Sequence, residues 1–136
     1  MAHASINTLS ASLQTGEVSA EELARYYLDR MAQHNPALNC IITVCEEAAL
    51  ASARASDARR REGQPLSALD GIPLLHKDAF CTEGTRTTCG SRMLSDWVAP
   101  YDATVVSRLA SAGLVMLGKT NMDEFAMGSS NEHSYF

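Results

Sequence analysis

Residues 71–78 read Gly71-Ile72-Pro73-Leu74-Leu75-His76-Lys77-Asp78, a short apolar run that ends on three ionisable groups. Turn-forming residues bound the run, as expected of a buried strand. In open α/β sheets, ligands bind at the carboxyl ends of the strands. The stretch therefore predicts a core strand of an α/β domain, with a candidate site at its end.

A helix and a second strand are expected further along the chain. The helix should be capped by Asp102 and should end at Gly113. Its apolar stripe consists of Val105, Val106, Leu109 and Ala112. The apolar residues 114–117 then predict a strand, and the order strand, helix, strand gives parallel pairing.

Two other segments of the second half carry weaker signals. The threonine-rich residues 82–88 predict a hairpin or an irregular excursion. Asn121 is placed to cap a last helix, with Asp123 and Glu124 in its first turn. Adjacent residues diverge around a helix axis, so we interpret the two carboxylates as capping groups rather than as an acid–base pair.

The first half predicts helices. The expected elements are a helix ending at Gly16, a helix from the Ser19–Glu22 capping box to Asn35-Pro36, a strand within residues 38–44 and a helix over residues 46–62. We expect residues 1–63 to form a helical layer and residues 64–136 the start of an α/β core, with a mixed sheet covered by helices. Two core strands do not make a self-sufficient sheet, so residues 1–136 should be the N-terminal part of a single larger domain.

Composition limits the function. The 136 residues are 46% hydrophobic and 20% charged, which is typical of a soluble globular domain. The net charge is -5 and the one basic run covers residues 59–61, so contact with RNA would need a partner. Residues 1–5 do not begin a targeting segment and no window has the apolar length of a membrane span, so we expect a cytoplasmic protein.

No metal or nucleotide site is expected. The cysteines lack the close paired spacing of a zinc site and are interpreted as reduced thiols; they are Cys40, Cys45, Cys81 and Cys89. A site built from His76, Asp78, Cys81 and Cys89 matches no ligand pattern. Gly118-Lys119-Thr120 follows strand-like residues rather than the glycine-rich loop that binds phosphates.

Lys77 is the candidate catalytic residue. A lysine titrates near about 10.4, so it is a base at neutral pH only where burial or nearby cations lower its pKa. The apolar residues before Lys77 favour burial, whereas the pattern alone also fits a solvated turn or a lysine that forms a Schiff base.

A second candidate segment is Met127-Gly128-Ser129-Ser130. Its serines fit either a substrate-contacting loop or local hydrogen bonds at a helix end.

Three blocks of the sequence resemble the amidase signature family. They are residues 71–84, 87–94 and 118–132. The later blocks are most similar to one branch, the glutaminase subunits of the bacterial glutamyl- or aspartyl-tRNA amidotransferases. The resemblance implies the amidase signature fold, incomplete in this chain.

The resemblance also implies roles for individual residues. Lys77 would be the neutral lysine that accepts a proton from a serine on a cis peptide bond, which in turn activates a nucleophilic serine. Residues bordering a glutamine pocket would be Met127, Gly128, Ser129 and Ser130. Hydrolysis of glutamine would supply ammonia for converting Glu-tRNA(Gln) to Gln-tRNA(Gln), or Asp-tRNA(Asn) to Asn-tRNA(Asn). The family's serine-rich stretch is not found in this sequence, so this chain alone is expected to release no ammonia.

Partners follow from the same resemblance. The B subunit of such an amidotransferase would bind ATP, Mg and the mischarged tRNA, and a small C subunit would brace a heterotrimer. This chain itself would need no cofactor and would not contact a membrane. A general amidase of the same family and a non-catalytic interaction module are the alternatives. Glutaminase activity stimulated by tRNA, or mixing with the B and C subunits, would separate them.

Overall fold

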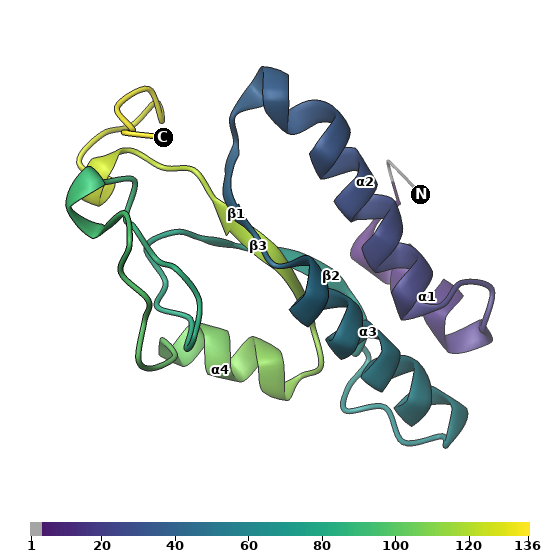
Figure 1. Cartoon of the computed structure of the whole chain (residues 1–136). Helices are drawn as coiled ribbons and strands as arrows, with labels where there is room; N and C mark the ends of the chain where they lie inside the picture. The colour runs from purple at the N-terminus through teal and green to yellow at the C-terminus, as the bar shows by residue number, and fades with distance from the viewer. Residues whose placement is uncertain (1–3) are drawn as a thin grey trace. The chain divides into compact units, whose positions relative to one another are not determined.

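A computed structural model describes residues 4–136 (Figure 1). Residues 1–3, which belong to the predicted helical layer, lie outside the described residues. The elements along the chain are α1 (Ile6–Thr15), α2 (Ala20–Leu38), β1 (Ile41–Val44), α3 (Glu46–Arg61), β2 (Pro73–Lys77), the 3-10 turn η1 (Arg92–Leu94), α4 (Thr104–Ser111), β3 (Val115–Thr120) and the 3-10 turn η2 (Glu124–Ala126). Within residues 4–136, no helix has the length and apolar character needed to cross a membrane.

The three strands form one sheet in the order β1-β3-β2. β1 pairs antiparallel with β3. β2 and β3 run parallel, because the Val115 N–H donates to the Ile72 carbonyl and the Asp78 N–H donates to the Thr120 carbonyl, in the same order along both strands. The predicted α/β class and the predicted parallel unit are confirmed.

The chain forms two compact units from interleaved stretches. Unit 1 contains the chain up to Arg30, Cys45–Leu74 and Leu109–Leu117. Unit 2 contains Met31–Val44, Leu75–Arg108 and Gly118–Phe136. The division at residue 64 into a helical layer and an α/β core stays a prediction.

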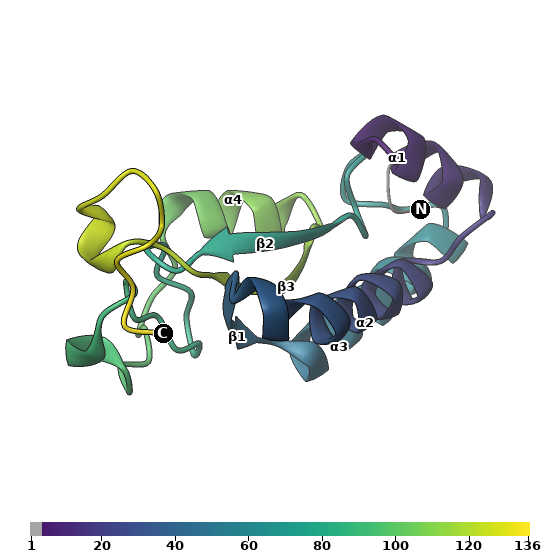
Figure 2. The ribbon, with the colours of Figure 1, turned by 90° about the horizontal axis from the view of Figure 1, so that it is seen from above.

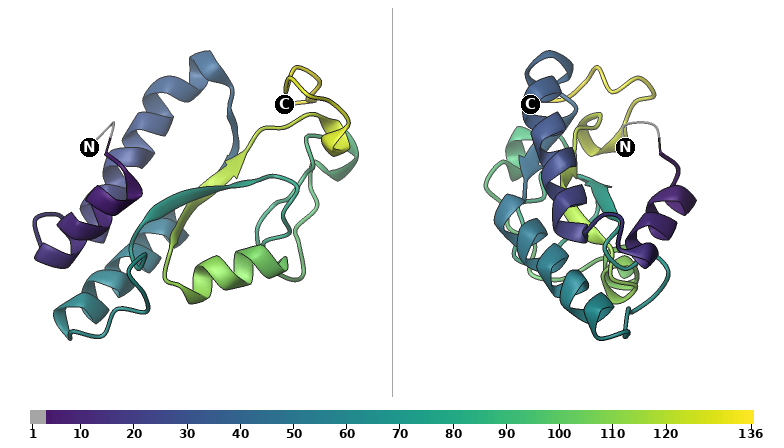
Figure 3. Two further views of the ribbon diagram at one scale, coloured as in Figure 1. Left: turned by 180° about the vertical axis from the view of Figure 1, so that it is seen from behind. Right: turned by 90° about the vertical axis from the view of Figure 1, so that its right-hand side faces the viewer.

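Unit 1 confirms the predicted start of α2. Ser19 Oγ accepts from the Glu22 N–H at 3.1 Å, and the Glu22 carboxylate accepts from the Ser19 N–H at 2.8 Å. The carboxylate of Asp57 accepts from the N–H groups of Ala20 at 2.7 Å and Glu21 at 3.1 Å. α3 lies alongside this end of α2 (Figures 2 and 3), so Asp57 of α3 can accept from the two backbone N–H groups that the capping box does not satisfy.

We expect Asp57→Asn to lower the free energy of unfolding by about 1 kcal/mol, because the N-terminus of α2 loses a charged acceptor. The matched control is Asp29→Asn, a carboxylate on the exposed face of α2. Urea denaturation of both variants provides the measurement. Equal stability of the two would show that Asp57 does not cap α2.

The predicted end of α2 is wrong. The helix continues past Pro36 to Leu38. It does so because the Asn35 carbonyl accepts from the Asn39 N–H at 2.7 Å, while the Asn35 side chain bonds the Ile41 N–H and carbonyl at 2.9 and 3.0 Å. The side chain thereby supplies local bonds that offset the donor missing at proline.

Two further predicted positions are corrected. Strand β2 begins at Pro73, two residues later than the apolar run indicated, because Gly71 forms a turn with φ 88° and bonds the Gly113 carbonyl. Asp102 does not cap α4, since its carboxylate accepts from the Glu83 N–H at 2.7 Å. Residues 82–88 are irregular as predicted, apart from a single bridge at Arg86.

Candidate functional site

Lys77 is the last residue of β2, and its side chain is exposed. Its neighbours in sequence are buried, with His76 5% and Asp78 0% exposed. Successive side chains point to opposite faces of a strand, so burying these two leaves Lys77 on the other face. Within residues 4–136 the Lys77 side chain is exposed, on a strand end that rests on a buried polar layer. Burial of Lys77 by further residues of the domain stays a prediction.

His76 lies in that buried layer. Burial lowers the pKa of its imidazole, and the nearby positive charge of Lys119 lowers it further, while Asp102 acts in the opposite direction. Its ring meets the ring of Phe80 edge to face, with the centroids 6.4 Å apart. His76 is therefore predominantly neutral at pH 7.

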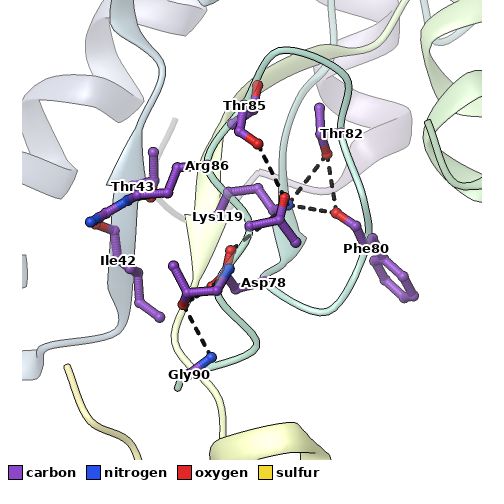
Figure 4. A network of polar contacts seen from close by, with 11 residues as sticks. Ile42, Thr43, Asp78, Phe80, Thr82, Thr85, Arg86, Gly90 and Lys119 are labelled. Carbon is purple, nitrogen blue, oxygen red and sulfur yellow. Dashed lines mark hydrogen bonds and ion pairs between the residues drawn. The ribbon is translucent and has the colours of Figure 1, made fainter. Parts of the chain in front are cut away.

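Lys119 of β3 is a fully buried cation (Figure 4). Its ammonium donates to the Phe80 carbonyl, to Thr87 Oγ1 at 2.9 Å and to Thr82 Oγ1 at 3.3 Å. It also lies 3.8 Å from Asp78 Oδ1. In the sequence, Lys119 stands out only within the rejected Gly118-Lys119-Thr120 string. The strand expected over residues 114–117 stops short of it, whereas β3 continues to Thr120 and so includes Lys119.

Asp78 connects the strand end to the loop that follows. Its Oδ2 accepts from the N–H of Thr88 at 2.9 Å and from the Thr88 hydroxyl. Its carbonyl accepts from the Cys89 N–H, and the Cys89 carbonyl accepts from the Phe125 N–H at 2.9 Å. A continuous series of bonds thus joins the residue after Lys77 to the start of the C-terminal loop.

Residues in this series and in the loop after it adopt left-handed backbone conformations. The φ angles are 53° at Cys89, 52° at Phe125, 60° at Ala126 and 59° at Asn131. A non-glycine residue in this region costs about 1 to 2 kcal/mol, and such residues gather at functional sites. Their concentration here supports a functional site rather than an ordinary surface loop.

The last predicted helix is wrong. In place of a helix capped by Asn121, the chain makes only the single turn η2, with Asp123 before it. The Asp123 carboxylate accepts from the N–H of Asn131 at 3.0 Å and of His133 at 2.9 Å, so it organises the loop instead of a helix terminus. A Cβ on residue 128 would lie 2.3 Å from Asp123 Oδ2, so only glycine fits at this position without displacing the carboxylate.

The candidate substrate-binding residues lie in this C-terminal loop. All are exposed; they are Met127, Gly128, Ser129 and Ser130. The loop runs beside η1 (Figure 3), where Ser91 Oγ donates to Glu124 and the Tyr135 N–H donates to the Gly90 carbonyl. Within residues 4–136, no hydrogen bond joins Lys77 to residues 127–130. Their role in a pocket stays a prediction.

The loop should lose stability in acid. The N–H of His133, followed by that of Asn131, lowers the pKa of Asp123 below its usual 3.8, although burial opposes this. A lowered folded-state pKa contributes stability above about pH 4, and the contribution is lost as the pH falls through the folded pKa. Asp123→Asn should therefore be less stable than the parent at pH 6, and this difference should shrink as the pH falls below about 4. Urea midpoints across this range provide the test, and a difference independent of pH would contradict it.

The cysteines within residues 4–136 are not linked to one another and form no metal-binding group. No disulfide joins them, and no group of three or more His, Cys, Asp or Glu in this part of the chain is placed to hold a metal ion. Burial and the negative charge of Asp78 raise the pKa of the Cys89 thiol. Cys89 is therefore protonated at neutral pH and a poor nucleophile.

A family model described as Amidase matches residues 22–136. The chain belongs to the amidase family. This amidase chain is 62% identical over its full length to the A subunit of glutamyl-tRNA(Gln) amidotransferase from Azoarcus sp. (strain BH72), and 62% identical over 94% of its length to the same subunit from Halorhodospira halophila. It spans 28% and 26% of those two proteins.

Solved structures agree with this membership. Peptide amidase from Stenotrophomonas maltophilia matches 91% of the amidase chain with a TM-score of 0.86 and 37% identity, over 26% of its own length. An amidase family protein from Bacillus anthracis matches 90% with a TM-score of 0.82 and 35% identity, over 25% of its own length. The predicted amidase signature fold is confirmed for the part of the fold that this chain covers.

Proposed function

We propose that this chain is the lysine-bearing part of the glutaminase subunit of a tRNA-dependent amidotransferase. The observation that carries the proposal is the place of Lys77, which is exposed at the carboxyl end of a parallel strand and flanked by buried His76 and Asp78. The 62% identity to the corresponding subunit of two amidotransferases supports glutamine as the substrate.

Lys77 acts as the base of acyl transfer in this proposal. This role requires a neutral amine at neutral pH, so we infer that further residues of the domain cover Lys77, which is exposed within residues 4–136. The neutral amine accepts a proton from a bridging serine, which withdraws one from the nucleophilic serine that attacks the side-chain amide of glutamine. Backbone N–H groups stabilise the oxyanion, ammonia leaves, and water releases glutamate. We expect both serines in the family's serine-rich stretch rather than at Ser129 and Ser130. These two residues, with Met127 and Gly128, border the glutamine pocket.

The partners are the B and C subunits of the amidotransferase, in a cytoplasmic heterotrimer. The B subunit binds ATP, Mg and the mischarged tRNA and receives the ammonia. The net charge of -5 supports this division, because a chain with little basic surface gains affinity for tRNA most readily through a partner. No cofactor is assigned to this chain.

A general amidase is the second candidate, favoured by the likeness to peptide amidase. The intact protein that contains this chain, assembled with the B and C subunits, should hydrolyse glutamine with a kcat/KM at least about 100-fold above that for a C-terminal peptide amide, since a site that pairs the polar groups of its substrate rejects analogues lacking them. Glu-tRNA(Gln) and ATP should stimulate the glutamine reaction. A preference for the peptide amide, with no response to tRNA, would establish the general amidase instead.

A further inference from the structure

Two buried charges of opposite sign lie next to the strand end that carries Lys77. Lys119 and Asp78 are both 0% exposed, with Nζ and Oδ1 3.8 Å apart. Burying an ion pair is costly, and such a pair persists only where further hydrogen bonds satisfy both groups. The reaction assigned to Lys77 does not use this pair, so its presence needs another explanation.

Three acceptors of the Lys119 ammonium belong to one loop. They are the Phe80 carbonyl and the hydroxyls of Thr82 and Thr87, whereas Lys119 itself comes from β3 (Figure 4). The Phe80 N–H in turn donates to the carbonyl of Lys77 at 3.0 Å. The Lys119 ammonium therefore holds the loop after β2 against the central strand β3. One of its acceptor residues, Phe80, is hydrogen-bonded to the backbone of Lys77.

Asp78 depends on the same cation. Its Oδ2 is occupied by Thr88, but Oδ1 is buried and makes no hydrogen bond within residues 4–136. The positive charge nearest to Oδ1 is that of Lys119. Loss of this charge would leave the aspartate buried without compensation, at the residue that directly follows Lys77.

We propose that Lys119 is a positioning residue for amide hydrolysis. Its ammonium holds Phe80 and Asp78, and so fixes the backbone that presents Lys77 to the substrate. Lys119 is fully buried and does not touch the substrate. The inference rests on the proposed role of Lys77 as the base. A displacement of a catalytic group by 1 Å lowers a rate by about 100-fold, so the backbone need shift only slightly.

The test compares three variants of the intact protein in its complex with the B and C subunits. Lys119→Met should lower kcat for glutamine by about 100-fold and leave KM within about threefold, with a lower Tm. Adding Asp78→Asn removes the uncompensated charge, so Tm should recover in the double variant while kcat stays low. Asp78→Asn alone provides the third corner of the cycle. Recovery of kcat together with Tm would show a purely structural role and overturn the proposal.

Two further variants separate the positioning role of Lys119 from a general loss of stability. Thr87→Val removes one acceptor and leaves the ion pair in place, so it should fold and lower kcat by about fivefold, the scale of one hydrogen bond. Arg59→Met breaks the bidentate contact with buried Asp70 in unit 1, at 2.7 and 2.9 Å. It should lower Tm but leave kcat of the folded protein within about twofold. A kcat for Thr87→Val equal to that of the parent would count against the proposal.

Hydrogen exchange separates this proposal from the role of Lys77. In Lys119→Met the amides of Thr87, Thr88 and Cys89 should exchange about tenfold faster, and those of α3 should not change. Unchanged exchange at these amides would overturn the positioning role whatever the activity. Full activity of Lys77→Met would overturn the proposed function. The hydrogen-exchange result would then still decide whether Lys119 holds the loop in place.

Discussion

Lys77→Met in the intact complex is expected to lower kcat for glutamine hydrolysis by about 1,000-fold or more, because general base catalysis contributes about 100-fold to 10,000-fold. Methionine has nearly the length of the lysine side chain and is unbranched, so the substitution removes the amine without opening a large cavity. Tm should therefore remain within about 2 °C of the parent value. Ammonia release at saturating glutamine is the measurement.

Lys77→Arg is the matched control for this result. A guanidinium keeps the positive charge and much of the length but cannot accept a proton at neutral pH. If Lys77 is the base, the arginine variant should be as inactive as Lys77→Met. An arginine variant that retains most of the activity would show that the charge matters and that the base lies elsewhere.

Gly118→Ala is expected to lower the free energy of unfolding by about 3 kcal/mol, the upper range for forcing extra atoms into a packed site. A Cβ at Gly118 would lie 2.2 Å from the carbonyl oxygen of Thr43, where β1 pairs with β3. The obstructing atom is backbone, so relief requires the strands to separate. Weakened pairing would also disturb Lys119, the next residue in β3.

The control for Gly118→Ala is Gly84→Ala. A Cβ at Gly84 would meet nothing within 4 Å, so only its φ of 69° opposes the alanine. This variant should lose about 1 kcal/mol. Denaturant titrations of both variants provide the comparison. Similar losses at the two positions would contradict the close contact between β1 and β3.

The sequence predicts the parts of the fold that depend on local signals. The capping box at Ser19 and the apolar run of β3 led directly to α2 and to the central strand. The helix expected after Asn121 fails for a tertiary reason, because Asp123 bonds the N–H groups of Asn131 and His133, ten residues or fewer further along, and so closes a loop. Asparagine and aspartate at such positions are equally compatible with a helix cap and with a closed loop.

The candidate site was predictable only in part. Lys77 stands out because it ends an apolar run, and the resemblance to amidases supports it. Its exposure depends on which face of β2 is covered, which is a property of the sheet rather than of the run. The role of Lys119 is not apparent from the sequence, because its acceptors Thr82 and Thr87 lie 37 and 32 residues before it. No spacing rule joins residues at such separations.

Transfer of isotope from the amide nitrogen of glutamine is the most direct test of the proposed function. Glutamine labelled with 15N in its side-chain amide would be supplied with ATP, Mg and Glu-tRNA(Gln) to the complex of the intact protein with the B and C subunits. Mass spectrometry of the amino acid released from the tRNA should show 15N-labelled glutamine with the parent protein, and unconverted glutamate with Lys77→Met. Equal labelling with Lys77→Met, or labelled ammonia with no label in the tRNA-bound amino acid, would contradict the account.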